Sequence, residues 1–98
     1  MIRILYNWNV APEKLELFIE TWKKTTNKIH KEVKGARGSF MVQSDNDPTA
    51  IKTMARWDSL DDWKKFWHEG NHSQMGFMHD LGERVSVEIF REIDDFTS

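Results

Sequence analysis

The stretch IRILYNWNVAP, residues 2–12, is the most informative about the fold because it contains a predicted strand and the start of the helix that follows it. Large apolar side chains stand at every second position up to Val10, which is typical of a strand with two different faces. Pro12 then suits the first turn of a helix, where its missing N–H removes no hydrogen bond. Apolar residues recur every three or four positions after it, so we expect a helix from Pro12 to about Lys34, ended by Gly35.

The rest of the chain continues the succession of strands and helices. Alternating apolar residues predict strands, and apolar stripes at helical spacing predict helices. In order, we expect a strand at 39–43, a strand at 50–57, a helix at 60–67, a short helix at 72–81, a strand at 85–90 and an acidic, flexible tail at 94–98.

This order predicts the fold class of a single domain that covers residues 1–98. Two right-handed crossovers joined by a hairpin give the ferredoxin-like βαββαβ arrangement, an α+β fold with a four-stranded antiparallel sheet and helices on one face. We expect the other sheet face to be apolar and open, with outward positions such as Tyr6 and Trp8. An open apolar face on a small domain predicts a homodimer in which two sheets pack together.

Composition and charge narrow the class of protein. The chain has 98 residues, a formal net charge of -2, 39% hydrophobic residues and no cysteine. The near-neutral charge argues against a nucleic-acid binder, and the absence of cysteine excludes disulfides, thiolate metal sites and cysteine nucleophiles. No run approaches the ~18 apolar residues of a membrane helix, and the first residues are typical of a strand rather than a signal peptide. We therefore expect a soluble, cytoplasmic protein that binds neither nucleic acid nor membranes.

Functional candidates have to come from polar groups among apolar ones, because the sequence contains no catalytic or phosphate-binding motif. Asn7 lies in the middle of the first strand, where asparagine is disfavoured, and its amide could hold a carbonyl or enolate oxygen. Trp67 stands at the end of a predicted helix, where a pocket mouth would form. His72 and His79 are seven residues apart and could both face inward from one short helix. The polar run at 25–27 is either a pocket wall or a solvated turn.

The two other histidines are weaker candidates. His30 follows an apolar residue of the long helix and is interpreted as a boundary residue. His68 and His72 have the four-residue spacing of a shared metal site, but Gly70 and Asn71 interrupt the helix that would carry both. The sequence therefore predicts no metal site.

Several segments together resemble one family. They are NWNVAP at 7–12, GARGS at 35–39 and ARWDSLDDW at 55–63, with His72 shortly after. With the long helix between them, they resemble the antibiotic biosynthesis monooxygenase superfamily of dimeric α+β barrels, over nearly the whole chain. The resemblance implies a homodimer of ferredoxin-like subunits, each with a pocket for a small apolar or aromatic ligand between helices and sheet.

Enzymes of that superfamily include small oxygenases that act on polycyclic phenols or quinols without metal or flavin. The resemblance thus implies a cofactor-independent monooxygenase that oxidises a small aromatic substrate, such as a phenol, quinol or polyketide-like compound, with O2. Such chemistry needs an apolar cavity, a base, and hydrogen-bond donors for the substrate anion. In this sequence His72 or His79 would be the base, and Asn7 or Trp67 would hold the oxyanion.

Two alternatives remain open. A second branch of the superfamily degrades haem with an Asn on the first strand, a Trp on the second helix and a His ligand on the next helix. Asn7 and Trp67 match the first two in place, whereas Phe77 stands near the expected ligand position with His72 and His79 to either side. Haem held by His79 is therefore the alternative cofactor prediction. The third interpretation is a non-catalytic, small-ligand-binding or stress-associated dimer.

Overall fold

The computed structural model describes residues 1–68 and 76–97 of the chain. Its elements are β1 (Ile2–Asn9), the 3₁₀ turn η1 (Pro12–Lys14), α1 (Leu15–Glu32), β2 (Ala36–Gln43), β3 (Ala50–Trp57), α2 (Leu60–His68), α3 (Gly76–His79) and β4 (Glu83–Arg91). Their order agrees with the order predicted from the sequence. Within the described ranges, no helix is both long and apolar enough to cross a membrane.

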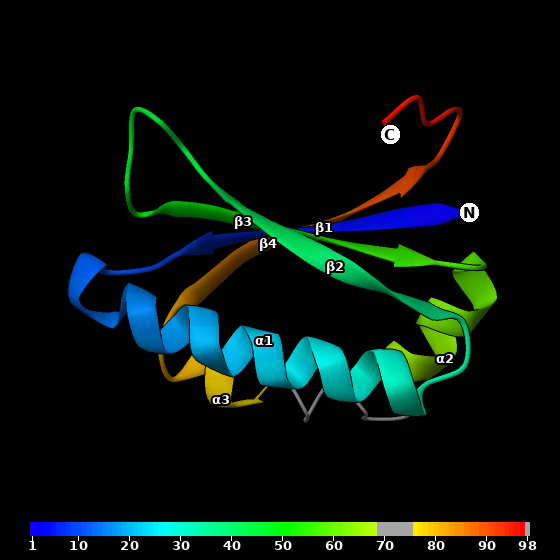
Figure 1. Cartoon of the computed structure of the whole chain (residues 1–98), viewed down its shortest axis with the longest axis horizontal. Coiled ribbons are helices and arrows are strands. Elements are labelled where there is room, and N and C mark those ends of the chain that lie inside the picture. Colours follow the sequence, from blue (N-terminus) through cyan, green and yellow to red (C-terminus); the bar gives the residue numbers. More distant parts are fainter. Residues whose placement is uncertain (69–75, 98) are drawn as a thin grey trace.

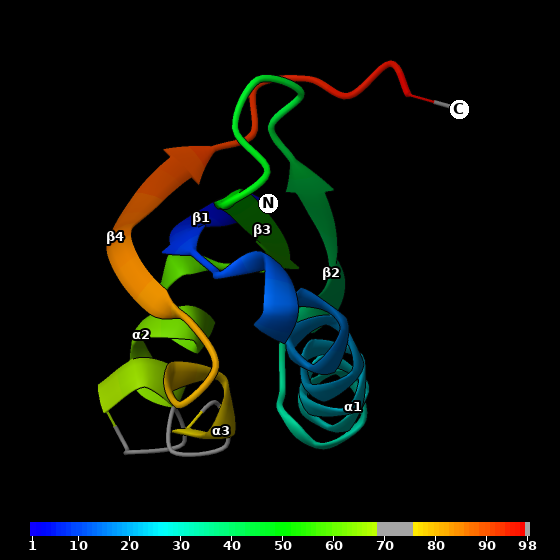
Figure 2. The same ribbon diagram turned by 90° about the vertical axis from the view of Figure 1, so that its left-hand side faces the viewer.

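The four strands form one antiparallel sheet in the order β2-β3-β1-β4. Helices α1, α2 and α3 all lie on the same side of this sheet, with α1 beneath the β2 side and α2 and α3 beneath the β4 side (Figures 1 and 2). None of the described helices covers the opposite side. This is the ferredoxin-like α+β arrangement, so the predicted fold class is confirmed. We call the two sides the covered face and the open face.

Strand β1 shows which side chains point to the covered face. Ile4, Tyr6 and Trp8 are buried beneath the helices, where Tyr6 is 4% and Trp8 2% exposed. Leu5 and Asn7 alternate with them and therefore lie on the open face. The prediction that Tyr6 and Trp8 point outward is wrong. Alternation separates two sets of side chains, but which set becomes buried is settled only when the helices pack on the sheet.

The helix predicted from Pro12 to Lys34 is divided and shorter. Its first residues form the separate turn η1, Pro12–Lys14, and α1 begins at Leu15. Gly35 has a φ of 86°, a left-handed conformation that glycine adopts without steric cost, and it turns the chain directly into β2. For that reason β2 begins at Ala36, three residues before the predicted strand.

Two elements in the second half also differ from their predicted bounds. β4 spans Glu83–Arg91 rather than 85–90, because it pairs along the whole of β1 and accommodates a bulge. α3, Gly76–His79, lies within the short helix predicted at 72–81. Residues 72–75 of that prediction fall outside the described residues.

The core lies between the helices and the sheet. Phe18 of α1 is fully buried and meets the Trp8 ring edge-on, with 5.1 Å between the ring centroids. Gly82 packs so closely here that an added Cβ would stand 2.8 Å from Val10 Cγ2. Burial of a large side chain such as Phe18 contributes about 1.5–3 kcal/mol to folding, so these contacts hold the N-terminal half of α1 on the sheet. The C-terminal half of α1 borders a cavity instead.

Candidate functional site

The cavity between the C-terminal half of α1 and the sheet is the candidate functional site. It holds about 50 Å³. Most of its wall is apolar or aromatic, contributed by Tyr6, Trp22, Ile29, Ala36, Ala55, Trp57, Phe66 and Met78. Small-molecule sites are usually concave and apolar, with a few placed polar groups. The polar groups of this cavity therefore decide what it can bind.

The polar run of α1 supplies part of the wall. Thr25 and Thr26 line the cavity, as do Trp22 one turn earlier and His30 one turn later. The sequence leaves open whether this run is a pocket wall or a solvated turn. The two threonines belong to the wall, whereas Asn27 is exposed. The helix thus brings two hydroxyls and one imidazole to one side of the cavity.

Two buried hydroxyls come from the sheet. Tyr6 of β1 and Thr53 of β3 are register partners, both line the cavity, and Thr53 is 2% exposed. Trp63 Nε1 donates a hydrogen bond to the Tyr6 hydroxyl at 3.1 Å, and Trp8 Nε1 donates one to Thr53 Oγ1 at 3.1 Å. Burial raises the pKa of Tyr6 to about 12, although the Trp63 hydrogen bond and the charge of Arg84 act in the opposite direction. The Tyr6 phenol therefore stays protonated near neutral pH.

His30 stands where the cavity meets solvent. It is exposed and yet lines the cavity. It lies over Gly38, where an added Cβ would be 3.9 Å from His30 Nδ1. Gly38 has a φ of 97°, so glycine is the residue that fits this approach. An imidazole in this position can take a proton from a group in the cavity and release it to water.

Trp67 belongs to a cluster of rings next to the cavity. Its ring stacks on Trp63 with 5.4 Å between centroids, and its centroid lies 6.3 Å from that of Tyr6. The guanidinium carbon of Arg84 lies 4.7 Å from the centre of the Trp67 ring, which is a cation–π geometry. Trp67 therefore packs against Tyr6 and Trp63, and it is not part of the described lining of the cavity.

His79 lies at a different place on the covered face. It is exposed, and its ring centroid is 5.6 Å from that of Trp8. It borders an open groove of about 770 Å³, whose wall includes the charged side chains Lys14, Asp80 and Glu83. His79 and the cavity are thus separate features of this face.

Asn7 lies on the open face, on the other side of the sheet from the cavity. Its amide nitrogen donates hydrogen bonds to Ser86 Oγ at 2.8 Å and to Glu88 Oε2 at 2.9 Å. Its oxygen accepts a hydrogen bond from Lys52 Nζ at 2.8 Å. The Asn7 amide is therefore part of a polar cluster across β3, β1 and β4.

Of the four predicted site residues, the structure describes Asn7, Trp67 and His79, and it does not bring these three together. Trp67 and His79 lie on the covered face in different surroundings, and Asn7 lies on the open face. His72 falls outside the described residues. The catalytic roles assigned to these four residues stay predictions.

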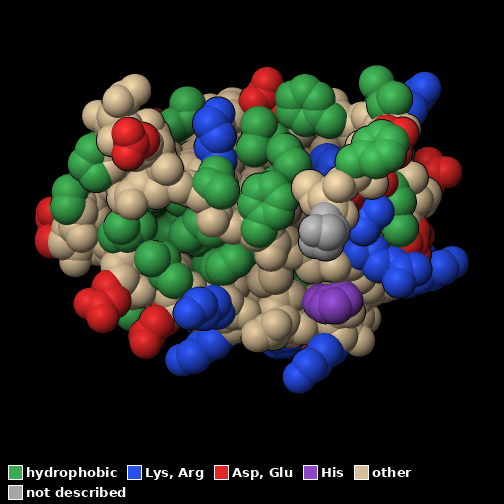
Figure 3. Space-filling model, turned by 45° about the horizontal axis from the view of Figure 1, so that its top comes forward, with side chains coloured by type: hydrophobic (Ala, Val, Ile, Leu, Met, Phe, Trp, Pro, Cys, Tyr) green, Lys and Arg blue, Asp and Glu red, His purple; other side chains and the backbone are tan. Residues whose placement is uncertain are grey.

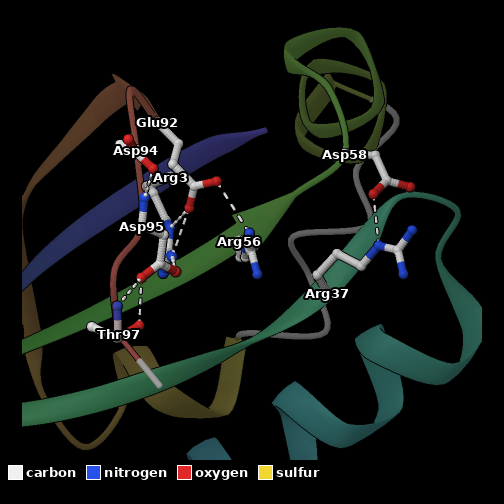
Figure 4. Close-up of polar contacts among 8 residues, drawn as sticks. All are labelled: Arg3, Arg37, Arg56, Asp58, Glu92, Asp94, Asp95 and Thr97. Carbon is white, nitrogen blue, oxygen red and sulfur yellow. Dashed lines mark hydrogen bonds and ion pairs between the residues drawn. The ribbon is translucent and has the colours of Figure 1, made fainter.

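A charged network occupies one end of the open face (Figure 4). Arg3 donates a hydrogen bond to Glu92 Oε1 at 2.7 Å, and Arg56 donates one to Glu92 Oε2 at 3.1 Å. Arg3 also pairs with Asp95 of the predicted tail at 3.1 Å. The hydrogen bond from Arg3, with a smaller contribution from Arg56, holds the pKa of the Glu92 carboxyl below its usual value. The network joins β1, β3 and the segment after β4.

Sequence reasoning did not select Tyr6, Thr53 or His30 as site residues. For His30 a signal existed, because it follows Trp22 by eight residues and Thr26 by four, which places all three on one side of a helix. For the two sheet hydroxyls no such signal existed, since their role depends on a register partner 47 positions away.

The chain also matches a known protein family. A sequence profile of the antibiotic biosynthesis monooxygenase family matches residues 1–75. The chain belongs to this family. The resemblance carried by 7–12, 35–39 and 55–63 is therefore confirmed, and the matched region includes β1, α1, β2, β3 and α2, which form most of the cavity wall. Among curated proteins, nothing matches the chain.

Solved structures share the whole architecture of this family member. A protein of Bordetella bronchiseptica named for the same family has 13% identity and a TM-score of 0.80, with 94% of this chain and 96% of that chain covered. A mutant of SnoaB, a cofactor-independent oxygenase from Streptomyces nogalater, has 10% identity and a TM-score of 0.78, with 99% and 97% covered. A conserved protein of Bacteroides thetaiotaomicron has 22% identity and a TM-score of 0.72, with 91% and 94% covered. At these identities the likeness shows that the fold is shared.

Haem, the alternative cofactor predicted for this member of the antibiotic biosynthesis monooxygenase family, does not fit the described residues. His79, the predicted ligand, is not in the described lining of the cavity, so it would not reach a haem placed there. The groove beside His79 has charged walls, which are costly against the apolar faces of a porphyrin. Within the described ranges, no cluster of three or more His, Asp or Glu could hold a metal ion.

Proposed function

We propose that this chain is a cofactor-independent monooxygenase that oxidises a small aromatic phenol or quinol with O2 in the cavity beneath α1. The observation that carries the proposal is the cavity itself, apolar on most of its wall, with an imidazole at its mouth and two hydroxyls at its sheet side. Membership of the antibiotic biosynthesis monooxygenase family and the shared fold of a cofactor-independent oxygenase support it.

The reaction needs no external electron donor, because the substrate supplies the electrons. A phenol loses its O–H proton, and the resulting phenolate reacts with O2 at a ring carbon that carries hydrogen. One oxygen atom stays on that carbon as a carbonyl, and the other leaves as water with the ring hydrogen and the phenol proton. The products are a quinone and one water, which balances one phenol and one O2.

His30 fits the role of the base that removes the phenol proton. It lies at the cavity mouth, so its imidazole meets the substrate on one side and solvent on the other. The apolar wall keeps water away from the anion and strengthens its interactions with nearby dipoles. Proton removal at the mouth and charge stabilisation at the sheet side are thus assigned to different residues.

The size of the cavity limits the substrate. It holds about 50 Å³, less than the ~150 Å³ of an apolar cavity that admits one benzene ring. Trp22 also lines a neighbouring groove of about 360 Å³ between α1 and β2. Because Trp22 stands between the two spaces, we propose that this side chain turns to admit a single-ring substrate.

The direct test is O2 consumption with hydroquinone and simple phenols, combined with ¹⁸O2 to follow one labelled atom into the product. Wild-type protein should incorporate one ¹⁸O per turnover. Replacement His30→Gln should lower kcat about 100-fold, within the range for loss of a general base. His68→Gln is the matched control, because His68 is exposed on α2 and outside the described lining. Aromatic binding without O2 consumption would favour a non-catalytic binding protein.

We also propose that the open face packs against a second copy of the chain. Phe40 is 48% exposed there, and Val42, Phe90, Leu5 and Met54 lie on the same face by register. Figure 3 shows hydrophobic side chains among charged ones over this side of the molecule. Exposed aromatic and branched residues on an uncovered sheet are typical of an interface, and a second copy offers the same apolar surface.

A further inference from the structure

We infer that Tyr6 and Thr53 form a pair of hydrogen-bond donors for one oxygen atom of the ligand, so that the cavity selects a flat ring bearing a phenolate or carbonyl oxygen. The inference rests on the proposed function in taking the cavity as the substrate site. It assigns the oxyanion-binding role to the covered face of the sheet.

The two indole N–H groups fix the direction in which each hydroxyl can act. Trp63 donates to the Tyr6 oxygen and Trp8 donates to Thr53 Oγ1, each at 3.1 Å. A hydroxyl has one hydrogen to donate and two lone pairs, whereas an indole nitrogen only donates. Each oxygen therefore uses a lone pair on its tryptophan, and its hydrogen has to find a different acceptor.

That acceptor is missing from the described part of the chain. There, Tyr6 and Thr53 take part in side-chain hydrogen bonds only as acceptors. Both residues are buried, so bulk water does not reach them freely. A buried donor without a partner is unfavourable, and an acceptor that enters the cavity removes this cost. The cavity is thus prepared for a ligand that brings a lone pair.

Both donors belong to the same stretch of cavity wall. Tyr6 and Thr53 are direct partners across β1 and β3 and both line the cavity, so a ligand that fills the cavity meets both side chains. Burial raises the pKa of Tyr6 to about 12, so its phenol keeps its proton wherever a ligand phenol is ionised.

The walls define the rest of the ligand. Trp22, Trp57 and Phe66 present aromatic groups around the same cavity, and rings pack favourably against rings. Two donors attract an oxygen with lone pairs and repel an ammonium group, which only donates. A phenolate gains most, because hydrogen bonds to a charged acceptor are the stronger ones.

The test uses 4-nitrophenol, whose phenolate absorbs visible light and whose nitro group makes it a poor electron donor that is not consumed. Bound to wild-type protein, the probe should ionise about one pH unit lower than when it is bound to Thr53→Val or Tyr6→Phe, a tenfold preference for the phenolate. Chlorobenzene, a ring of similar size that carries no oxygen atom, should bind wild type and variants within about twofold.

Matched variants separate the donor role from folding. Tyr6→Phe leaves the Trp63 N–H without an acceptor, so the double variant Tyr6→Phe/Trp63→Phe removes both partners and should still lack the phenolate preference. Thr53→Ser keeps the hydroxyl and should restore the preference. Thr21→Val changes a threonine of α1 outside the described lining and should behave as wild type.

Two results would overturn the donor pair. One is an unchanged ionisation of bound 4-nitrophenol in both hydroxyl-free variants, and the other is an equal loss of chlorobenzene binding, which would mean that only the cavity shape changed. The outcome is independent of turnover. A phenolate preference without O2 consumption upholds the donor pair and removes the monooxygenase proposal. Turnover of phenols without that preference upholds the monooxygenase proposal and removes the donor pair.

Discussion

Polar groups on the covered face of the sheet are buried, whereas those on the open face are in contact with solvent. On the covered face the hydroxyls of Tyr6 and Thr53 are buried, and each accepts an indole hydrogen bond in a fixed direction. On the open face, charged side chains pair with one another beside exposed apolar residues. Burial makes each polar contact on the covered face directional and costly to lose, whereas solvent weakens those on the open face. The first arrangement suits a ligand site, and the second suits association.

The largest effect should come from the interior of the covered face. Phe18→Ala removes a fully buried ring that contacts Trp8, so the free energy of unfolding should fall by about 3–5 kcal/mol in a urea titration. Leu17→Ala is the control on the same helix, because Leu17 is 54% exposed, and it should cost less than about 1 kcal/mol. Equal losses would mean that α1 is packed on a different side.

The next effect concerns association through the open face. Phe40→Asp places a charge in the proposed interface, so the dimer dissociation constant should rise about 100-fold or more in sedimentation equilibrium. Leu17→Asp puts the same charge on an exposed position of the helix layer and should leave the dimer intact. A dimer that survives Phe40→Asp and dissociates with Leu17→Asp would move the interface to the helices.

A smaller effect is expected from acid. The pKa of Glu92 is lowered in the folded chain, first by the Arg3 hydrogen bond, so its contribution is complete above the usual glutamate pKa of ~4.3 and is lost as pH falls through the lower folded-state value. Glu92→Gln should therefore flatten the fall of Tm below about pH 4. The exposed Glu16→Gln on α1 should keep the wild-type slope. A slope unchanged by Glu92→Gln would mean that other carboxyls govern acid stability.

The smallest effect should be that of Asn7 on catalysis. Asn7 lies across the sheet from the cavity and bonds to Ser86, Glu88 and Lys52, so Asn7→Ala should leave kcat/KM within about twofold. Steady-state O2 consumption measures it, with Tm as the check on folding. A large drop in kcat/KM at unchanged Tm would give Asn7 the catalytic role that the sequence predicts and contradict a site confined to the covered face.

Most of the fold could be predicted from the sequence because strand and helix periods are local properties. Alternating apolar residues, as around Tyr6, predict the strands, and apolar stripes, as around Phe18, predict the helices, which together give the order of the elements. The start of β2 was missed, because β2 begins directly after the left-handed turn at Gly35 and pairs with β3 along the sheet. The cavity was visible only in part, through the threonines at 25 and 26 within the apolar stripe of α1.

Local patterns in the amino-acid sequence predicted the α+β fold, because strand and helix periods are properties of neighbouring residues. The segments at 7–12, 35–39 and 55–63 resembled the antibiotic biosynthesis monooxygenase family, and the family profile confirms that resemblance. Three-dimensional packing was needed to establish which face of β1 the helices cover, and with it that Tyr6 and Thr53 line a cavity while Asn7 points away. The physical reason is that a strand presents two faces of nearly equal apolar character. The choice between them depends on packing with α1 and α2, whose residues lie far away in the sequence.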